Sequence, residues 1–185
     1  MLTLTLLRHA KSSWSQPAEG PAVDDHDRAL NKRGMRAAPV MATHMKALGV
    51  RPQRVLCSTA LRTRQTLDAV IDALPQTISV IYDRALYLAD EETLKEALCN
   101  APEDVRTQLL IGHNPGLERL ALRLTGSGDE IARASMATKF PTAALAIITF
   151  DAPAFSAITW GSGTLLHYQV PRALDHRAID RDHRR

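Results

Sequence analysis

The sequence predicts an α/β protein: a three-layer α/β/α sandwich on a mostly parallel sheet with at least one antiparallel strand. Over the first two thirds of the chain, short apolar runs alternate with segments of helical periodicity, as in parallel βα repeats. Later apolar runs follow one another with connections too short for a crossover helix, so those strands should be antiparallel neighbours. A length of 185 residues, 45% of them hydrophobic, suits one sizeable core.

The elements of the first part are bounded by turn and capping residues. The periodicity predicts strands at 2–7, 54–57, 77–82 and 108–112, each followed by a helix, at about 31–48, 60–74, 91–98 and 115–124. Asn31, Ser58 or Thr59, and Asp90 can cap three of these helices, and Pro115 suits the first position of the fourth. Pro39 should kink its helix or shift the start. A polar loop is expected over 10–27.

The last part should hold a short helix and a strand meander. After a Ser/Gly/Asp turn, we expect a helix near 130–134 and strands at 143–150, 157–160 and 164–170. We take residues 1–171 as one domain. Residues 172–185 are charged and nearly without core-forming side chains, so they are expected to form a flexible C-terminal tail.

Composition excludes several classes of protein. The net charge is +3, but the basic residues are spread among acids, which argues for a solvated surface with an anion site and against a nucleic-acid partner. No apolar stretch approaches the ~20 residues of a bilayer span. Since the N-terminus also lacks a basic leader and cleavage site, we infer a cytoplasmic protein and no membrane contact. Cys57 and Cys99 should be buried reduced thiols.

Three positions that follow predicted strands can carry chemistry: Arg8-His9, Arg62 and His113. Open parallel sheets bind ligands at the carboxyl ends of their strands, so these side chains should meet there. Two guanidiniums and two imidazoles beside helix N-termini suit a dianionic tetrahedral group. A neutral His9 nitrogen can attack phosphorus, while the others stabilise the equatorial oxygens. The alternatives are a chance Arg-His pair, a capping turn at Gly112–Pro115, and Arg62 on a solvated face beside Arg64.

The motifs carry a family resemblance. Leu7-Arg8-His9-Ala10 resembles the R-H-G signature of the histidine phosphatase (phosphoglycerate mutase-like) superfamily, residues 58–66 resemble its S-x-x-x-R-x-x-x-T segment, and Gly112-His113-Asn114 resembles its second-histidine motif. SixA-type phosphohistidine phosphatases are most similar, through the segments Arg8–Ser12, Asp27–Leu30 with Gly34, Gly112–Pro115 and Phe140–Thr142. The resemblance spans about residues 2–171.

The resemblance implies a role for each matched residue. His9 would be the phosphorylated nucleophile, and Arg8, Arg62 and His113 would form the phosphate pocket. Ser12 would offer a hydroxyl to the phosphate, and Arg28 would lie at the rim near the substrate's charge, although a structural role is equally open. Asn114, at the place where the phytase-like branch has Asp, is taken as substrate-binding. The chemistry implies no cofactor and no metal, and the other histidines lack zinc-ligand spacing.

The leaving group decides between substrates. Phosphomonoesterases of the superfamily need an acid, yet Asp83, Asp90, Glu91 and Glu92 stand in no acid motif and are read as loop residues and a helix cap. Imidazole leaves without such help more readily than an alkoxide. We therefore expect phosphohistidine in a protein, such as a phosphotransfer domain, as substrate. The alternatives are a phosphomonoesterase or mutase acting on a small phosphorylated molecule, and a non-catalytic phosphate-binding protein. The sequence does not predict the oligomeric state.

Overall fold

The sheet is built around the N-terminal strand β1 (Leu2–Arg8). In the computed structural model, which describes residues 1–13 and 23–174, seven strands lie in the order β3-β2-β4-β1-β6-β7-β5. The others are β2 (Arg54–Ser58), β3 (Ser79–Asp83), β4 (Thr107–Gly112), β5 (Thr125–Gly128), β6 (Leu145–Phe150) and β7 (Gly163–Gln169). Strand β6 runs antiparallel to β1 and β7, and the remaining pairs are parallel. The predicted mostly parallel sheet is confirmed.

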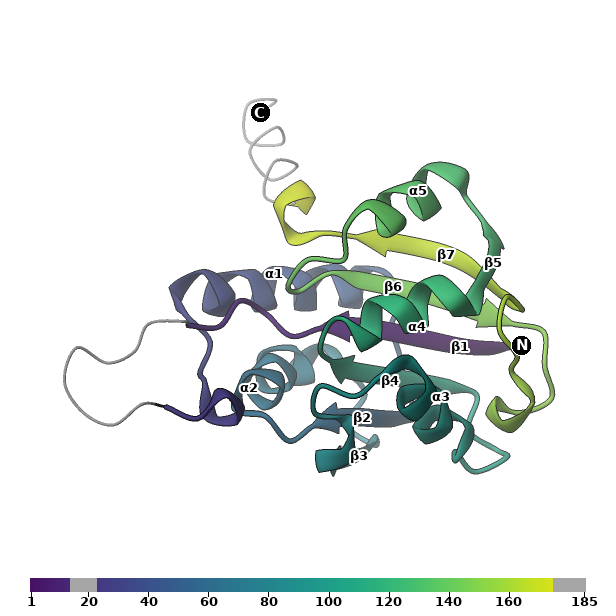
Figure 1. Cartoon of the computed structure of the whole chain (residues 1–185), viewed down its shortest axis with the longest axis horizontal. Coiled ribbons are helices and arrows are strands. Elements are labelled where there is room, and N and C mark those ends of the chain that lie inside the picture. Colours follow the sequence, from purple (N-terminus) through teal and green to yellow (C-terminus); the bar gives the residue numbers. More distant parts are fainter. Residues whose placement is uncertain (14–22, 175–185) are drawn as a thin grey trace.

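Helices cover both faces of the sheet, which gives the predicted three layers (Figure 1). They are α1 (Lys32–Ala47), α2 (Leu61–Val70), α3 (Glu91–Cys99), α4 (Gly116–Leu124) and α5 (Glu130–Thr138), with short 3-10 turns η1 (Asp25–Asp27), η2 (Ile71–Ala73), η3 (Arg84–Leu86) and η4 (Phe155–Ala157). Alternate β1 residues Leu2, Leu4 and Leu6 face the core shared with α3, α4 and α5. Leu7 faces the core shared with α1 and α2.

Helix starts follow the capping residues only in part. Asn31 accepts hydrogen bonds from the backbone N–H groups of Arg33 and Gly34, so α1 begins directly after it and runs on through Pro39. Asp90 caps α3 as predicted. The N-cap of α2 is Ala60, which has no side-chain capping bond, and the hydroxyl of the predicted cap Ser58 lies 2.8 Å from His113 Nε2. Pro115 precedes the first residue of α4, Gly116, rather than being it.

The C-terminal part differs from the sequence prediction in three places. No strand forms at 157–160: η4 and a loop stand there, and Phe155 and Ile158 are buried in the core without pairing in the sheet. The expected turn at 125–128 is instead the edge strand β5, where Gly126 passes so close to the Gly161 carbonyl that a Cβ would lie 1.9 Å from its oxygen. Helix α5 is longer than predicted and ends at Thr138.

Two predicted segments lie partly outside the described residues. Of the polar loop over 10–27, the described part holds η1 and a single bridge between Ser12 and Leu30. Of the proposed tail, only residues 172–174 are described, and Leu174 packs against the α1 and α2 core. Within the described residues, no helix is long and apolar enough to cross a membrane.

Candidate active site

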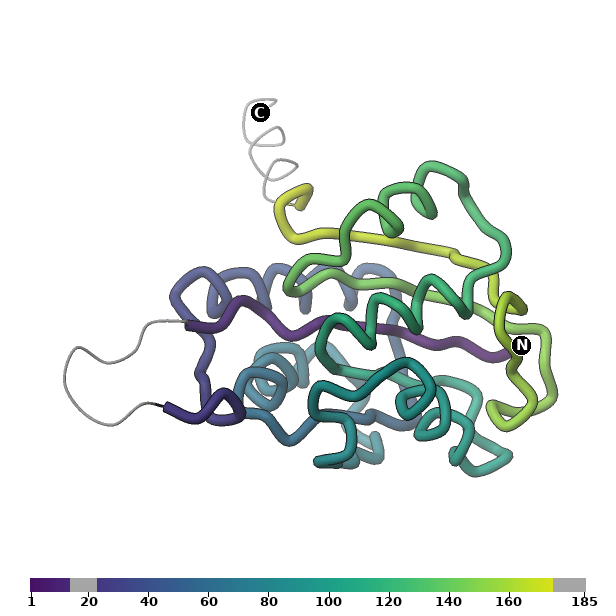
Figure 2. Tube along the Cα trace, viewed as in Figure 1, coloured from purple at the N-terminus to yellow at the C-terminus, as the bar shows by residue number. Residues whose placement is uncertain are grey.

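The two histidines of the site follow the central strands. Arg8 pairs with Gly112 in the parallel register of β1 and β4, so the residues after them, His9 and His113, leave the sheet side by side. The His9 backbone N–H donates to the Gly112 carbonyl over 3.1 Å, and the two imidazole centroids lie 5.1 Å apart. Figure 2 shows the chain leaving β1 at this end of the sheet, where the turn before α1 also lies. The predicted convergence is therefore present.

His9 is buried in one defined tautomer. Its Nδ1 lies 2.7 Å from the backbone oxygen of Ala10, and because a carbonyl only accepts, the ring proton resides on Nδ1. The lone pair is then on Nε2. Burial, opposed by the Ala10 hydrogen bond and reinforced by the charges of Arg62 and Arg8, lowers the pKa of His9 to about 4. A neutral His9 with an unprotonated Nε2 can act as a nucleophile.

His113 is 2% exposed and also neutral. Burial, followed by the charges of His9 and Arg62, lowers its pKa to about 2. Its Nε2 lies 2.8 Å from the Ser58 hydroxyl, and its buried Nδ1 has no hydrogen-bond partner among the described residues. Its ring lies perpendicular to that of Tyr87, with centroids 5.4 Å apart. A buried imidazole of this kind can bind a ligand atom.

The two arginines, of which Arg62 is buried and Arg8 is half-buried, are cations close to the imidazoles. Arg62, in the first turn of α2, is 3% exposed, whereas Arg64 is exposed, so the reading of Arg62 as a solvated surface cation is wrong. Arg8 donates from Nη1 to the Phe140 carbonyl over 2.8 Å, and its buried Nε has no partner among the described residues. Burial lowers the pKa of Arg8, but a guanidinium stays charged. The two guanidiniums can hold an anion against His9.

Supporting contacts keep these side chains in place. The Thr66 hydroxyl accepts from the Ala10 backbone N–H over 2.9 Å and donates to the Arg62 carbonyl, which ties α2 to the loop after His9. Asn114 donates from its amide nitrogen to Glu118 and to the Phe140 carbonyl, both over 3.0 Å. Because the Phe140 carbonyl also accepts a hydrogen bond from Arg8, Asn114 helps to fix Arg8. Its predicted substrate-binding role stays a prediction.

Ser12 and Arg28 lie together at the rim. Arg28 donates from Nε to the Ser13 carbonyl over 2.7 Å and from Nη2 to the Ser12 hydroxyl over 2.9 Å. The buried Ser12 hydroxyl accepts in that bond, so its own hydrogen can be donated to another oxygen. Arg28 also pairs with Asp25 through Nη1. Through Asp25, Arg28 is linked to the buried Arg62, so both Ser12 and Arg28 lie close enough to the site to serve the predicted substrate-binding roles.

Asp25 is a site residue that the sequence analysis missed. Its carboxylate accepts from the Tyr87 hydroxyl over 2.5 Å, from Arg62 Nη2 over 2.9 Å and from Arg28 Nη1, and its carbonyl accepts from Arg62 Nη1. Partial burial acts in the opposite direction, but these hydrogen bonds hold the pKa of Asp25 well below its usual range. In the sequence, nothing separates Asp25 from its acidic neighbours Asp24 and Asp27.

The four acids considered as proton donors have other partners. Asp83 accepts from the backbone N–H of Ala85, and Asp90 accepts from that of Thr93. Glu91 and Glu92 form ion pairs with Arg123 on the surface. They occupy the capping and surface positions that the sequence analysis favoured for them.

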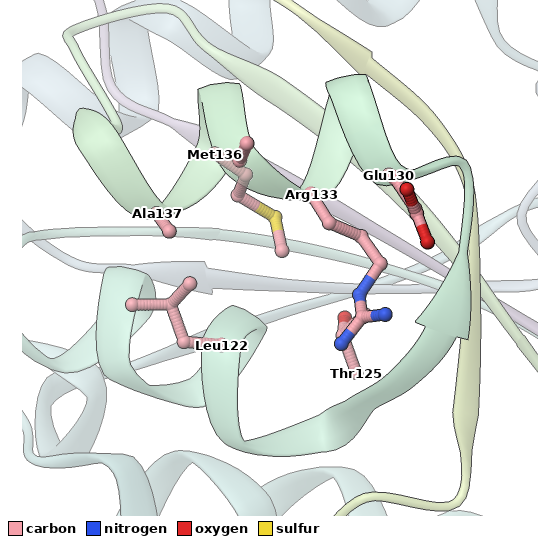
Figure 3. Close-up of a pocket in the computed structure, with 7 residues that line it drawn as sticks. Leu122, Thr125, Glu130, Arg133, Met136 and Ala137 are labelled. Carbon is pink, nitrogen blue, oxygen red and sulfur yellow. The ribbon is translucent and has the colours of Figure 1, made fainter.

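Two further observations concern a metal site and a second pocket. Within the described residues, no group of three His, Cys, Asp or Glu side chains could hold a metal ion. A surface pocket lies elsewhere, at the far end of α4 from His113 (Figure 3); it is lined by Leu122, Thr125, Glu130, Arg133, Ala134, Met136 and Ala137. None of the predicted site residues borders this pocket.

Comparisons with known proteins agree with this geometry. A model of the histidine phosphatase superfamily (branch 1) matches residues 4–87. Uncharacterized protein ML1117 of Mycobacterium leprae is 36% identical over 168 residues, which cover 90% of this chain and 100% of that protein.

Solved structures are also similar. A protein of Agrobacterium tumefaciens that carries the name phosphohistidine phosphatase SixA is 30% identical, with a TM-score of 0.75 and coverage of 92% of this chain and 98% of that one. The protein histidine phosphatase SixA complexed with tungstate is 26% identical, with a TM-score of 0.72 and coverage of 94% and 99%.

The fold and these matches define the class of protein as a hydrolase, a phosphatase built on a phosphoglycerate mutase-like sandwich. The chain belongs to the histidine phosphatase superfamily and is SixA-like within it.

Proposed function

We propose that the protein is a phosphohistidine phosphatase, which hydrolyses the P–N bond of phosphohistidine in a protein through a phosphorylated His9. The observation that carries this proposal is the tautomer of His9: the Ala10 carbonyl holds the proton on Nδ1, so Nε2 is free to attack phosphorus. Arg8, Arg62 and His113 lie near the His9 ring, and in this proposal they stabilise the negative charge on the phosphoryl oxygens.

The first step transfers the phosphoryl group to the enzyme. His9 Nε2 forms a bond to phosphorus, the P–N bond of the substrate breaks, and its electron pair stays on the leaving ring nitrogen. The phosphorylated His9 ring then carries a positive charge. The Nδ1–H bond to the Ala10 carbonyl stabilises this charge.

The second step releases phosphate. A water oxygen attacks phosphorus, one water proton passes to a phosphoryl oxygen, and the electron pair of the P–N bond returns to His9 Nε2, so the ring is neutral again and the product leaves as dihydrogen phosphate. His9 therefore needs no added proton to act as a leaving group. Ser12 donates its hydroxyl to a phosphoryl oxygen, and Arg28 contacts the substrate at the rim.

The choice of a P–N substrate rests on the acids of the site. Among the described residues, Asp83, Asp90, Glu91 and Glu92 are occupied as caps and in surface ion pairs, and Asp25 is held ionised. An alkoxide leaving group would need a protonated acid, whereas an imidazole does not. The substrate protein is proposed to be a phosphotransfer domain or a similar carrier in signal transduction, and a cytoplasmic location stays a prediction.

The test compares substrates on the purified protein. A phosphohistidine-bearing phosphotransfer domain should be turned over with a higher kcat/KM than sugar phosphates or p-nitrophenyl phosphate. Higher turnover of a sugar phosphate would instead support a small-molecule phosphomonoesterase or mutase. His9→Ala should abolish turnover and leave the circular dichroism spectrum unchanged. If wild-type protein neither turned over the phosphohistidine substrate nor retained phosphate on His9 after alkaline quenching, which preserves the P–N bond, a non-catalytic phosphate-binding role would replace this proposal.

A further inference from the structure

Asp25 lies on the solvent side of Arg62 and Arg28. Its side chain is 43% exposed, while the side chains of its partners Arg62 and Arg28 are 4% and 12% exposed. It comes from η1, a turn of the loop between β1 and α1, and not from the strand ends that carry the histidines. Asp25 therefore borders the mouth of the site and not its floor.

The leaving group must also lie at the mouth. His9 is 7% exposed and forms the floor, and phosphoryl transfer places the attacking and leaving atoms in line on opposite sides of phosphorus. With attack from His9, the leaving atom faces away from the floor, toward the side where Asp25 stands. This argument rests on the proposed function, in which His9 is the nucleophile.

The chemistry of Asp25 suits a cationic leaving group. Arg28, Arg62 and Tyr87 all donate to it, so its carboxylate is charged and has no proton for an alkoxide. A carboxylate oxygen can still accept another hydrogen bond. Arg62 uses one donor on each Nη for Asp25, so its other N–H groups remain available for the phosphoryl oxygens.

We propose that Asp25 selects the leaving group, by accepting the N–H of the distal ring nitrogen of the substrate's phosphohistidine. That hydrogen bond favours the protonated ring. When the P–N bond breaks, the electron pair moves onto the phosphorylated ring nitrogen, the positive ring becomes a neutral imidazole, and the distal nitrogen keeps its hydrogen. No proton donor is required, and esters without a ring N–H gain nothing from Asp25.

The test is the ratio of two activities in Asp25→Asn. For phosphoimidazole, whose leaving group is the bare ring, kcat/KM should fall at least about tenfold more than for p-nitrophenyl phosphate, since a hydrogen bond to a charged group is lost. Asp27→Asn removes the same charge two residues away, where the side chain contacts neither Arg62 nor Tyr87, and should leave the ratio unchanged. Asp25→Glu should keep most of the preference.

Equal losses on both substrates would mean that Asp25 only positions Arg62 and Arg28, and would overturn the inference while the phosphohistidine proposal stands. A substrate variant tests the same point without a mutation. N-methylated phosphoimidazole is permanently charged but has no distal N–H, so wild-type protein should cleave it more slowly than phosphoimidazole. Equal rates would also overturn the inference. Absence of activity of the wild-type protein on the phosphoprotein would contradict the proposed function itself and not only the role of Asp25.

Discussion

Arg62 and Arg64 differ in environment although they stand two residues apart on α2. Arg62 is buried beside His9, and Arg64 is exposed near the Tyr82 ring. Removing one donor that stabilises a transition state typically lowers the rate by about 10² or more, so Arg62→Ala should reduce kcat/KM at least ~10²-fold. Arg64→Ala is the matched control and should stay near wild type. Equal effects of the two variants would place Arg62 outside the phosphate pocket.

The buried histidines also predict acid sensitivity of the fold. The pKa values of His9 and His113 are lowered by burial to about 4 and about 2, while unfolded histidine titrates at about 6.5. The unfolded chain therefore binds more protons below about pH 6.5, and stability is lost as the pH falls through this range. At pH 4.5 each histidine should cost about 2–3 kcal/mol.

Urea unfolding at pH 7 and pH 4.5 measures this cost. His113→Gln has no ring to protonate, so its free energy of unfolding should fall on acidification by about 2 kcal/mol less than that of the wild type. Parallel losses in the two proteins would mean that His113 is not held neutral by the fold.

At the level of single residues, the sequence predicted the groups that follow strands. His9, Arg62 and His113 were expected to meet because parallel strands end at one edge, and the structure brings them together. Asp25 could not be found in this way. It reaches the site from a loop, and its role depends on hydrogen bonds to Arg62 and Tyr87, which are distant in sequence.

Helix α1 touches the loop after His9 through a glycine. A Cβ at Gly34 would lie 2.1 Å from the Lys11 backbone oxygen, so Gly34→Ala must push α1 and this loop apart. Overpacking of this kind costs roughly 1–3 kcal/mol, and kcat/KM should fall with it because the loop carries Ser12. Thermal unfolding and steady-state rates measure both effects.

Gly112 provides the control for this substitution. A Cβ there would meet only side-chain atoms, at 3.6 Å and 3.9 Å, which is ordinary contact. Gly112→Ala should therefore destabilise the protein less than Gly34→Ala. The reverse order would show that α1 is not tightly packed on the loop.

Elements were predicted well where a cap or periodicity defined them and poorly where tertiary packing did. α1 and α3 begin where Asn31 and Asp90 predict. The apolar run at 157–160 was taken as a strand, but its side chains are buried without pairing in the sheet. β5 has the composition of a turn and pairs only because β7 lies beside it. Burial alone does not reveal which backbone hydrogen bonds a segment makes.

On the scale of the whole molecule, catalysis should be independent of metal ions. The proposed mechanism neutralises the phosphoryl charge with Arg8, Arg62 and His113 instead of a divalent cation. Activity should therefore be unchanged after dialysis against EDTA and should not rise when Mg²⁺ or Zn²⁺ is returned. Loss on chelation with recovery on metal addition would contradict the mechanism.

The domain boundary can be tested by truncation. Leu174 packs on the α1 and α2 core, so a chain that ends at residue 174 keeps this contact and should keep the melting temperature of the full chain. A chain that ends at residue 170 loses this contact and should melt lower. If the chain that ends at residue 174 also melted much lower, residues 175–185 would belong to the folded domain and the proposed tail would be wrong.

The architecture as a whole was the most predictable level. Alternating strand and helix patterns fixed the parallel part of the sheet, and the short connections late in the chain led to the expected antiparallel β6. Strand order could not be predicted from the periodicity, because the local sequence pattern carries no information that β1 lies between β4 and β6.

The hydrogen bond from His9 Nδ1 to the Ala10 carbonyl has a consequence for isotope-labelled protein. With that nitrogen occupied, the covalent intermediate should form as a single regioisomer, the tele-phosphohistidine, and the pros form should be absent. ¹⁵N spectra of quenched enzyme separate the two isomers by their ring shifts, so one small backbone contact should be visible in the chemical identity of the trapped species.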